Sequence, residues 1–144
     1  MSFIGFQRFT SIVGPNGSGK SNVIDSLLFV FGKRASKMRL KKVSELIHKS
    51  EQHPDLEYCK VTVHFVDVYH DDTDEEQVVP GSDLWVTRTA TRNDISKYYV
   101  NDRPSKFNEV VDLFIAKGVD LNSGRFLILQ VCSWISNAAL IAVG

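Results

Sequence analysis

The chain has 144 residues, 43% of them hydrophobic, which is enough for one domain with an apolar core. Its 17 basic and 17 acidic side chains cancel, so the composition excludes the overall positive field that is typical of many nucleic-acid-binding proteins. The N-terminus has no basic-then-apolar leader, and no apolar run reaches about 18 residues, which predicts a soluble intracellular protein without membrane contact.

The N-terminal part of the sequence predicts a strand, a glycine-rich turn, a helix and a basic loop. Residues 9–13 (FTSIV) are rich in strand-forming side chains and precede a glycine, which predicts a short buried strand. A helix is predicted over residues 20–31, because apolar residues recur there at helical spacing before Gly32 provides a stop. Residues 33–42 (KRASKMRLKK) hold six basic side chains and no acid, which favours a solvated loop over a DNA contact.

The middle of the sequence alternates in a way that indicates β structure. Residues 43–48 (VSELIH) predict one or two helical turns. Polar and apolar side chains then alternate over residues 57–69, which predicts one long half-buried strand. The acidic stretch at residues 67–76 (DVYHDDTDEE), with a Pro-Gly pair soon after it, predicts a solvated hairpin loop.

The C-terminal part predicts three further strands and a helix. Strands are expected at residues 84–91 and 97–101, the second ending in an Asn-Asp turn. An amphipathic helix is expected at residues 108–117, where a glycine stops it, and a buried strand at residues 125–130 (RFLILQ). These elements together predict an α/β chain with a long antiparallel region after its first helix.

The turn before the first helix carries the most specific motif of the chain. Residues 14–21 (GPNGSGKS) match the phosphate-binding pattern G-x-x-x-x-G-K-[ST] in full. Glycines let main-chain N–H groups approach an anion closely, and the start of the helix adds the positive end of its dipole. Lys20 would place a full charge at the β- and γ-phosphates, and the Ser21 hydroxyl would bind Mg²⁺. The predicted nucleotide-binding residues are Gly14, Pro15, Asn16, Gly17, Ser18, Gly19, Lys20, Ser21 and Asn22.

This motif does not by itself select a reaction. A GTPase would carry an N-K-x-D element and a D-x-x-G switch, and neither pattern occurs in the sequence. A stand-alone P-loop kinase or GTPase-like enzyme stays as an alternative, as does a fragment without activity. Neither enzyme class explains the long antiparallel region.

The residues around and beyond the motif carry a family resemblance. GPNGSGKSNVIDSLLFVFG, with Ser-Asn after the lysine, resembles the N-terminal head of structural maintenance of chromosomes (SMC) ATPases. The segments KRASKMRLKKVSELIHKS, VTVHFVDV, WVTRTATRN and GVDLNSGRFLILQ look like the condensin-type large subunit, the fourth eukaryotic SMC class. The resemblance covers about residues 9–130 and implies an α/β P-loop NTPase fold of ABC/SMC head type, as an N-terminal lobe with an antiparallel β subdomain.

Two more site residues follow from the resemblance alone. Arg39 is similar to the arginine of the SMC loop that approaches the nucleotide phosphates; taken by itself it is a solvated basic residue. Gln130 resembles the Q-loop glutamine that reaches Mg²⁺ and the attacking water; taken by itself it is a polar residue at a strand end. The resemblance thus implies Arg39 and Gln130 as catalytic residues, and Ser21 and Gln130 as ligands of Mg²⁺.

The resemblance also implies what else the family head uses. An SMC N-terminal lobe is expected over residues 1–130, and residues 131–144 (VCSWISNAALIAVG) form an apolar tail outside the family pattern, interpreted as a splice variant or a gene-model error. The Walker B aspartate, the catalytic glutamate and the signature motif belong to a C-terminal head half, so hydrolysis by this chain alone is not expected.

The expected partners of the chain follow from the same resemblance. They are the C-terminal head half, a second SMC head, non-SMC condensin subunits, and DNA through the complex. The full-length parent would act in mitotic chromosome condensation, in the nucleus, on chromosomes and also in the cytoplasm.

Overall fold

The computed structural model describes residues 9–32, 42–70, 76–119 and 139–142. It divides into two compact units, residues 1–26 with 111–144 and residues 27–110, and the boundaries fall inside two helices. Residues 33–41 and the predicted strand at residues 125–130 lie outside the described residues.

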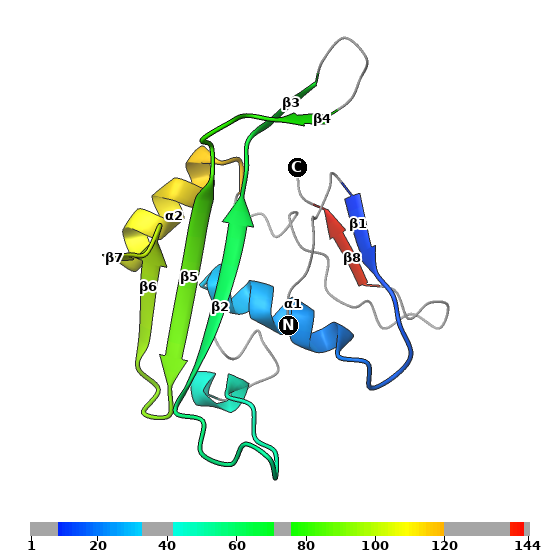
Figure 1. The fold of residues 1–144 in the computed structure, drawn as a ribbon, viewed down its shortest axis with the longest axis vertical. Helices are drawn as coiled ribbons and strands as arrows, with labels where there is room; N and C mark the ends of the chain where they lie inside the picture. The colour runs from blue at the N-terminus through cyan, green and yellow to red at the C-terminus, as the bar shows by residue number, and fades with distance from the viewer. Residues whose placement is uncertain (1–8, 33–41, 71–75, 120–138, 143–144) are drawn as a thin grey trace. The chain divides into compact units, whose positions relative to one another are not determined.

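The first unit contains a two-stranded antiparallel ribbon. Strand β1 (Phe9–Ile12) pairs with strand β8 (Ala139–Ala142), as the blue and red arrows of Figure 1 show. β1 confirms the predicted strand; the predicted burial is not found over residues 11–13, where Ser11 and Val13 are exposed and Ile12 is half-buried. A strand is buried only where its sheet is covered on both faces, and among the described residues β1 pairs with β8 alone. The strand β8 was not predicted.

Helix α1 (Lys20–Val30) confirms the predicted helix to within a residue. The apolar residues that recur at helical spacing are buried, and Phe29 and Val30 are fully buried too. The buried surface therefore extends over more than one side of the helix. The helix ends at Gly32, whose φ of +77° suits glycine, and the Gly32 N–H donates to the Phe29 carbonyl at 3.1 Å.

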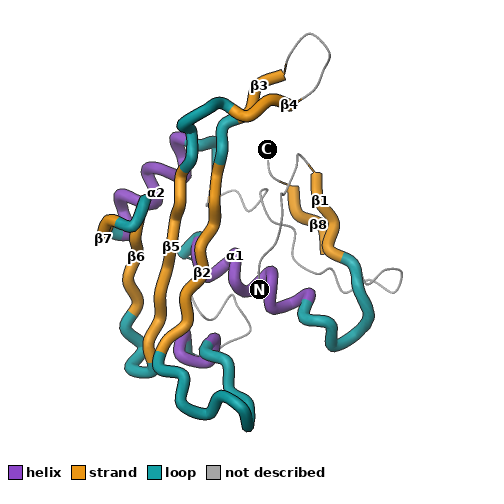
Figure 2. The backbone as a smooth tube through the Cα atoms, viewed as in Figure 1, coloured by secondary structure: helices purple, strands orange, loops and turns teal. Residues whose placement is uncertain are grey.

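The second unit is built on a four-stranded antiparallel sheet, which confirms the predicted antiparallel subdomain. The strands lie in the order β2-β5-β6-β7, side by side in Figures 1 and 2. Their bounds are β2 (Tyr58–Phe65), β5 (Leu84–Thr91), β6 (Ser96–Val100) and β7 (Arg103–Ser105). β7 was not predicted because Pro104 argues against a strand, but a proline is tolerated on an edge strand such as this one.

The strand register defines two different faces of this sheet. The alternation of β2 is confirmed: its odd-numbered side chains are half-buried and its even-numbered ones exposed. On the face of the even-numbered side chains, Thr62 lies opposite the buried Thr87 with hydroxyl oxygens 2.9 Å apart. The neighbouring pair, His64 and Trp85, stacks with parallel rings 3.7 Å apart, so cross-strand pairs stabilise this face.

The long strand predicted over residues 57–69 is in fact two strands. β2 ends at Phe65, and β3 (Val68–His70) pairs with β4 (Glu76–Val78) in a separate hairpin. The main chain leaves the large sheet at Asp67, whose N–H donates to Ser82 Oγ at 2.9 Å and whose carbonyl accepts from Val79 at 2.9 Å. The alternation of polar and apolar side chains continues across this break, so the sequence pattern could not reveal that the strand is interrupted.

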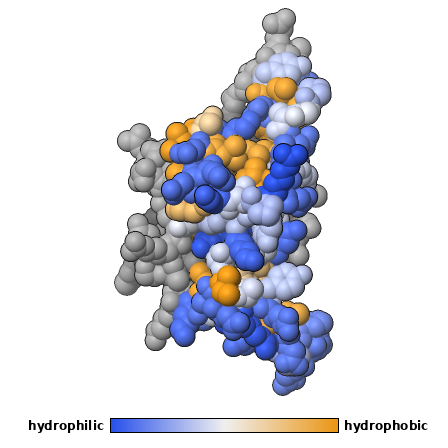
Figure 3. All heavy atoms as spheres, turned by 90° about the vertical axis from the view of Figure 1, so that its left-hand side faces the viewer, coloured by the Kyte–Doolittle hydropathy of each residue, from blue (hydrophilic) through white to orange (hydrophobic). Residues whose placement is uncertain are grey.

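The remaining predicted helices are also present. The turns at residues 43–48 form a 3₁₀ helix, η2 (Val43–Leu46), and the amphipathic segment forms α2 (Phe107–Ala116). α2 ends at Gly118 (φ +79°), where the Val119 N–H donates to the Phe114 carbonyl at 2.8 Å in a Schellman-type cap. On the face shown in Figure 3, apolar areas are interspersed with hydrophilic residues. No helix among the described residues is long and apolar enough to cross a membrane.

Candidate functional site: a phosphate-binding loop

The predicted phosphate motif lies in the first unit, between the end of β1 and the start of α1. Two of its glycines have positive φ angles, +82° at Gly17 and +92° at Gly19, which other residues rarely adopt. A Cβ at Gly17 would meet nothing within 4 Å, and one at Gly19 would only reach an Asn22 amide at 4.0 Å. The loop therefore has open space beside its main chain, as an incoming phosphate requires.

Helix α1 starts inside the motif and directs its first turn at the loop. The Asn22 and Val23 N–H groups donate to the Gly19 carbonyl, at 2.9 and 3.3 Å, and so begin the helical ladder. Donors ahead of this point have no carbonyl in the preceding turn of helix, and they carry the positive end of the helix dipole. This arrangement favours an anion next to residues 19–21.

The Lys20 ammonium lies against the main chain of the phosphate-binding loop. Its Nζ donates to the main-chain carbonyls of Gly14 and, at 2.8 Å, of Pro15. Gly14 itself is closely approached, since a Cβ there would come within 2.7 Å of Ser18 Oγ. These contacts hold the cation over the loop, where the β- and γ-phosphates of a nucleotide would replace the carbonyls as its partners.

Of the two predicted Mg²⁺ ligands, Ser21 and Gln130, only Ser21 lies within the described residues. Ser21, half-buried in the first turn of α1, would offer its hydroxyl to Mg²⁺, while Asn16 and Asn22 are exposed beside it. Arg39 and Gln130, the other two predicted site residues, lie outside the described residues. Within the described parts of the chain, no cluster of three His, Cys, Asp or Glu residues could hold a metal ion on its own.

Sequence reasoning did not single out one further polar cluster, around Arg88 in the second unit. The Arg88 guanidinium donates to Ser96 Oγ at 2.7 Å and to the Phe29 carbonyl at 2.6 Å, and burial lowers its pKa. The signal was present in the alternation, because Arg88 shares the inward face of β5 with Val86 and Ala90. A lone cation on an apolar strand face indicates a specific partner.

A glycine-rich loop between a strand and a helix, with a lysine over its mouth, defines a P-loop nucleotide-binding protein. The family model for the RecF/RecN/SMC N terminal domain matches residues 3–123, and the chain belongs to this SMC family. The fold is that of an SMC head ATPase, and the resemblance found in the sequence is confirmed. The comparisons support this interpretation. They give no support to the alternative of a stand-alone kinase or GTPase.

Curated relatives from several organisms share one name. The chain is 59% identical over 122 residues to structural maintenance of chromosomes protein 4 of Schizosaccharomyces pombe, and 50% identical over 124 residues to that of Homo sapiens. These alignments cover 85% and 86% of this chain but only 9% and 10% of the relatives. The chain therefore spans about a tenth of the length of the curated relatives that it matches.

Solved SMC heads share the fold. A structure from work on ATP-driven dimerization and DNA stimulated activation of SMC ATPases matches with a TM-score of 0.69 and 32% identity, covering 88% of this chain and 72% of that one. The Smc head bound to the C-winged helix domain of ScpA matches with a TM-score of 0.65 and 29% identity, covering 81% of this chain and 34% of that one.

Proposed function

We propose that this chain binds ATP and Mg²⁺ as the N-terminal part of a condensin-type SMC ATPase head. The loop geometry is the observation that carries the proposal: positive φ angles at Gly17 and Gly19 beside open space, and the Lys20 ammonium over the loop. Bound Mg²⁺ would neutralise the β- and γ-phosphates. The chain's own contribution is to hold these phosphates with main-chain N–H groups, Lys20 and the Ser21 hydroxyl.

The roles of Arg39 and Gln130 are part of the same proposal. Arg39 would approach the phosphates from the basic segment, and Gln130 would reach Mg²⁺ and the attacking water, as the family resemblance implies. Hydrolysis would need the Walker B aspartate, catalytic glutamate and signature motif of a C-terminal head half. We do not assign that role to Asp67, because the strand that it follows is antiparallel.

The partners and the process are also proposals. The relatives named structural maintenance of chromosomes protein 4, and solved heads described as bound to ScpA or as dimerizing with ATP, support a second SMC head and non-SMC subunits as partners. We propose that DNA is reached through this complex, and that the full-length parent acts in mitotic chromosome condensation in the nucleus.

The nucleotide proposal is tested by isothermal titration of the chain with ATP and Mg²⁺. Lys20→Ala should weaken binding by about tenfold or more, because a charge-assisted contact to phosphate is lost. The matched control is Lys60→Ala, an exposed lysine of β2, which should bind as the wild type does. Equal affinity of Lys20→Ala and wild type for ATP would refute the proposed nucleotide site. A preference for GTP over ATP would favour the alternative of a stand-alone GTPase-like enzyme.

The division of labour is tested by ATP turnover. The chain alone should hydrolyse ATP at the background rate, and addition of the C-terminal half of an SMC head should raise the rate. Steady hydrolysis by this chain alone, abolished by Lys20→Ala, would show that the catalytic groups need no second half.

A further inference from the structure

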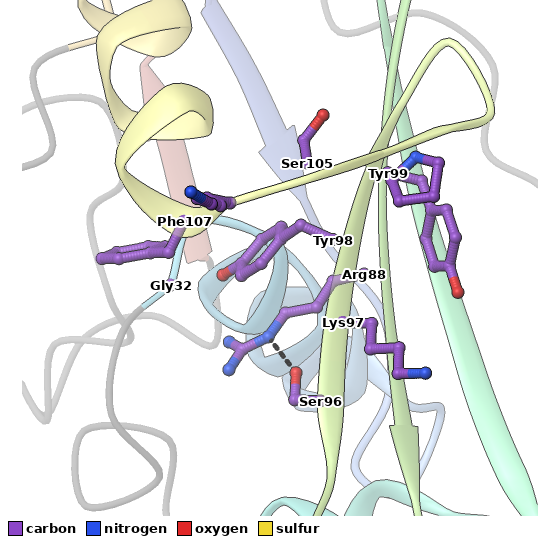
Figure 4. Close-up of a pocket in the computed structure, with 10 residues that line it drawn as sticks. Gly32, Arg88, Ser96, Lys97, Tyr98, Tyr99, Ser105 and Phe107 are labelled. Carbon is purple, nitrogen blue, oxygen red and sulfur yellow. Dashed lines mark hydrogen bonds between the residues drawn. The ribbon is translucent and has the colours of Figure 1, made fainter.

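The second unit contains a cavity of about 530 Å³. It lies where the end of α1, the strands β5, β6 and β7, and the start of α2 come together (Figure 4). Its lining residues include Gly32, Arg88, Ser96, Tyr98, Ser105 and Phe107. All of them belong to residues 27–110, and no residue of the phosphate-binding loop is among them.

Arg88 brings a charge with spare donors to the cavity. Its Nε donates to Ser96 Oγ and its Nη1 to the Phe29 carbonyl, and neither of these two bonds uses Nη2. The guanidinium carbon lies 4.4 Å from the ring centre of Phe29 and 4.9 Å from that of Tyr98, which holds the group in place by cation–π contact. Because the planar guanidinium is fixed on one side, its remaining N–H groups keep a defined direction.

Tyr98 brings a buried donor without a partner. The side chain is only 7% exposed, and its hydroxyl has no hydrogen-bond partner among the described residues. Burial raises the pKa of Tyr98 to about 12, so the hydroxyl keeps its proton at neutral pH. A buried, unpaired hydroxyl costs about 1–3 kcal/mol, and native structures keep such a group mainly where a ligand, water or ion completes it.

The charge around the cavity is positive. Its described lining residues include Arg88, Lys97 and Lys106 and no Asp or Glu. Figure 4 shows Lys97 and Tyr99 on the opposite side of β6 from the Arg88 guanidinium, so the charge of Lys97 does not lie on the side of Arg88. The Glu109 carboxylate accepts the main-chain N–H of Lys106 at 2.8 Å, and Glu109 does not line the cavity.

We propose that this cavity binds a phosphate-type oxyanion, with the Arg88 guanidinium and the Tyr98 hydroxyl as its donors. Donors from β5 and β6 approach from different directions, which suits a tetrahedral anion better than a planar carboxylate. Free phosphate and a phosphomonoester on a side chain present the same chemistry. The site goes beyond the proposed ATP function and does not depend on it.

The test is a titration of the full chain with inorganic phosphate, followed by the amide resonances of Ser96, Ser105 and Phe107. All proteins carry Lys20→Ala, so that phosphate at the ATP loop does not contribute. The three amides should shift saturably, and Tyr98→Phe should weaken binding by about tenfold, the effect of one hydrogen bond to a charged group. Tyr99→Phe removes the neighbouring hydroxyl on the other side of β6 and should leave the affinity unchanged.

Two results would overturn the proposal: no saturable shift up to about 50 mM phosphate, or equal affinity for Tyr98→Phe and its parent. A repeat with O-phosphoserine distinguishes the sources, because tighter binding than phosphate indicates a protein-borne ester and weaker binding the free ion.

Thermal unfolding with and without phosphate distinguishes a phosphate-binding hydroxyl at Tyr98 from one with a purely structural role. In phosphate-free buffer Tyr98→Phe should be as stable as its parent or more stable, since an unpaired hydroxyl is removed. Phosphate should then stabilise the parent more than the variant. If Tyr98→Phe is destabilised equally with and without phosphate, the hydroxyl has a protein partner and the proposal fails.

Discussion

The Arg88 guanidinium donates a hydrogen bond of 2.6 Å to the main-chain carbonyl of Phe29, 59 residues earlier in the chain. Phe29 lies in the last turn of α1, at the negative end of the helix dipole, and its carbonyl also accepts the Gly32 N–H at 3.1 Å. The last turn of α1 contains no basic residue of its own. A cation from β5 therefore adds a second, charged donor to the Phe29 carbonyl at the end of the helix, beside the Gly32 N–H.

This contact predicts a large effect of substitution at Arg88. Arg88→Met should lower the free energy of unfolding by about 2–3 kcal/mol, because it removes two side-chain hydrogen bonds, one to the Ser96 hydroxyl and one to the Phe29 carbonyl, which keeps only the Gly32 N–H. Arg88→Lys should recover only part of this, since one ammonium cannot reproduce the fork of the guanidinium. Urea denaturation measures both values.

The control for Arg88 is Arg103→Met, on the exposed edge strand β7, which should change stability by no more than about 0.5 kcal/mol. Wild-type stability of Arg88→Met would mean that the contact of Arg88 with the end of α1 contributes nothing.

Gly32 predicts a second effect, on packing. Its φ is +77°, and a Cβ there would lie 2.2 Å from Phe107 Cε2 and 3.1 Å from the Tyr98 hydroxyl oxygen. Gly32→Ala should therefore cost about 1–2 kcal/mol for the backbone conformation and a further amount for displacing the Phe107 ring. Differential scanning calorimetry measures the loss as a lower Tm.

A matched glycine separates these two causes. Gly81 has the same φ of +77°, but a Cβ there would meet nothing within 4 Å, so Gly81→Ala should show the backbone cost alone. Adding Phe107→Ala should make Gly32→Ala no more costly than Gly81→Ala, measured against the Phe107→Ala parent. Equal losses for the two glycine variants in the wild-type background would contradict the steric argument.

Asp94 predicts a dependence of stability on pH. Hydrogen bonds from Ser44, from its side chain and then its main-chain N–H at 3.0 Å, hold the pKa of the Asp94 carboxyl below its usual value. A carboxyl whose pKa is lower in the folded state stabilises the fold above its unfolded pKa, and this contribution disappears as pH falls through the folded pKa. Wild type should therefore exceed Asp94→Asn in Tm near neutral pH, and the difference should vanish in acid.

Asparagine is the suitable replacement at this position because Asp94 has a φ of +57°, which asparagine tolerates. Ser44→Ala removes one of the donors and should reduce the pH-dependent difference. A Tm difference between wild type and Asp94→Asn that stays constant from neutral pH to acid would contradict the role of the carboxylate charge.

The local elements were largely predictable from the sequence. Periodicity located α1, α2, β5 and β6 within one or two residues and the start of β2 within one, because each has a face whose burial imposes a period of about 3.6 or 2. The elements that were missed are short or depend on pairing. The break at Asp67 is made by contacts with Val79 and Ser82, and β7 contains a proline, so neither has a local signal.

The candidate site divides in the same way. The loop at residues 14–21 follows from the motif, because glycine dihedrals and a helix start are local properties of the chain. The position of the Lys20 ammonium over the Gly14 and Pro15 carbonyls could not be predicted, since a lysine side chain has many rotamers.

The sequence by itself determined a phosphate-binding loop, an antiparallel region and membership of the SMC family, because these depend on residue types at fixed spacing. Only the tertiary structure decided that Arg88 contacts the end of α1, that Phe107 packs on Gly32, and that Tyr98 has a buried hydroxyl without a partner. Those relationships join residues far apart in the chain, and their geometry depends on how β5, β6 and the two helices come together. No local pattern of residues encodes that arrangement.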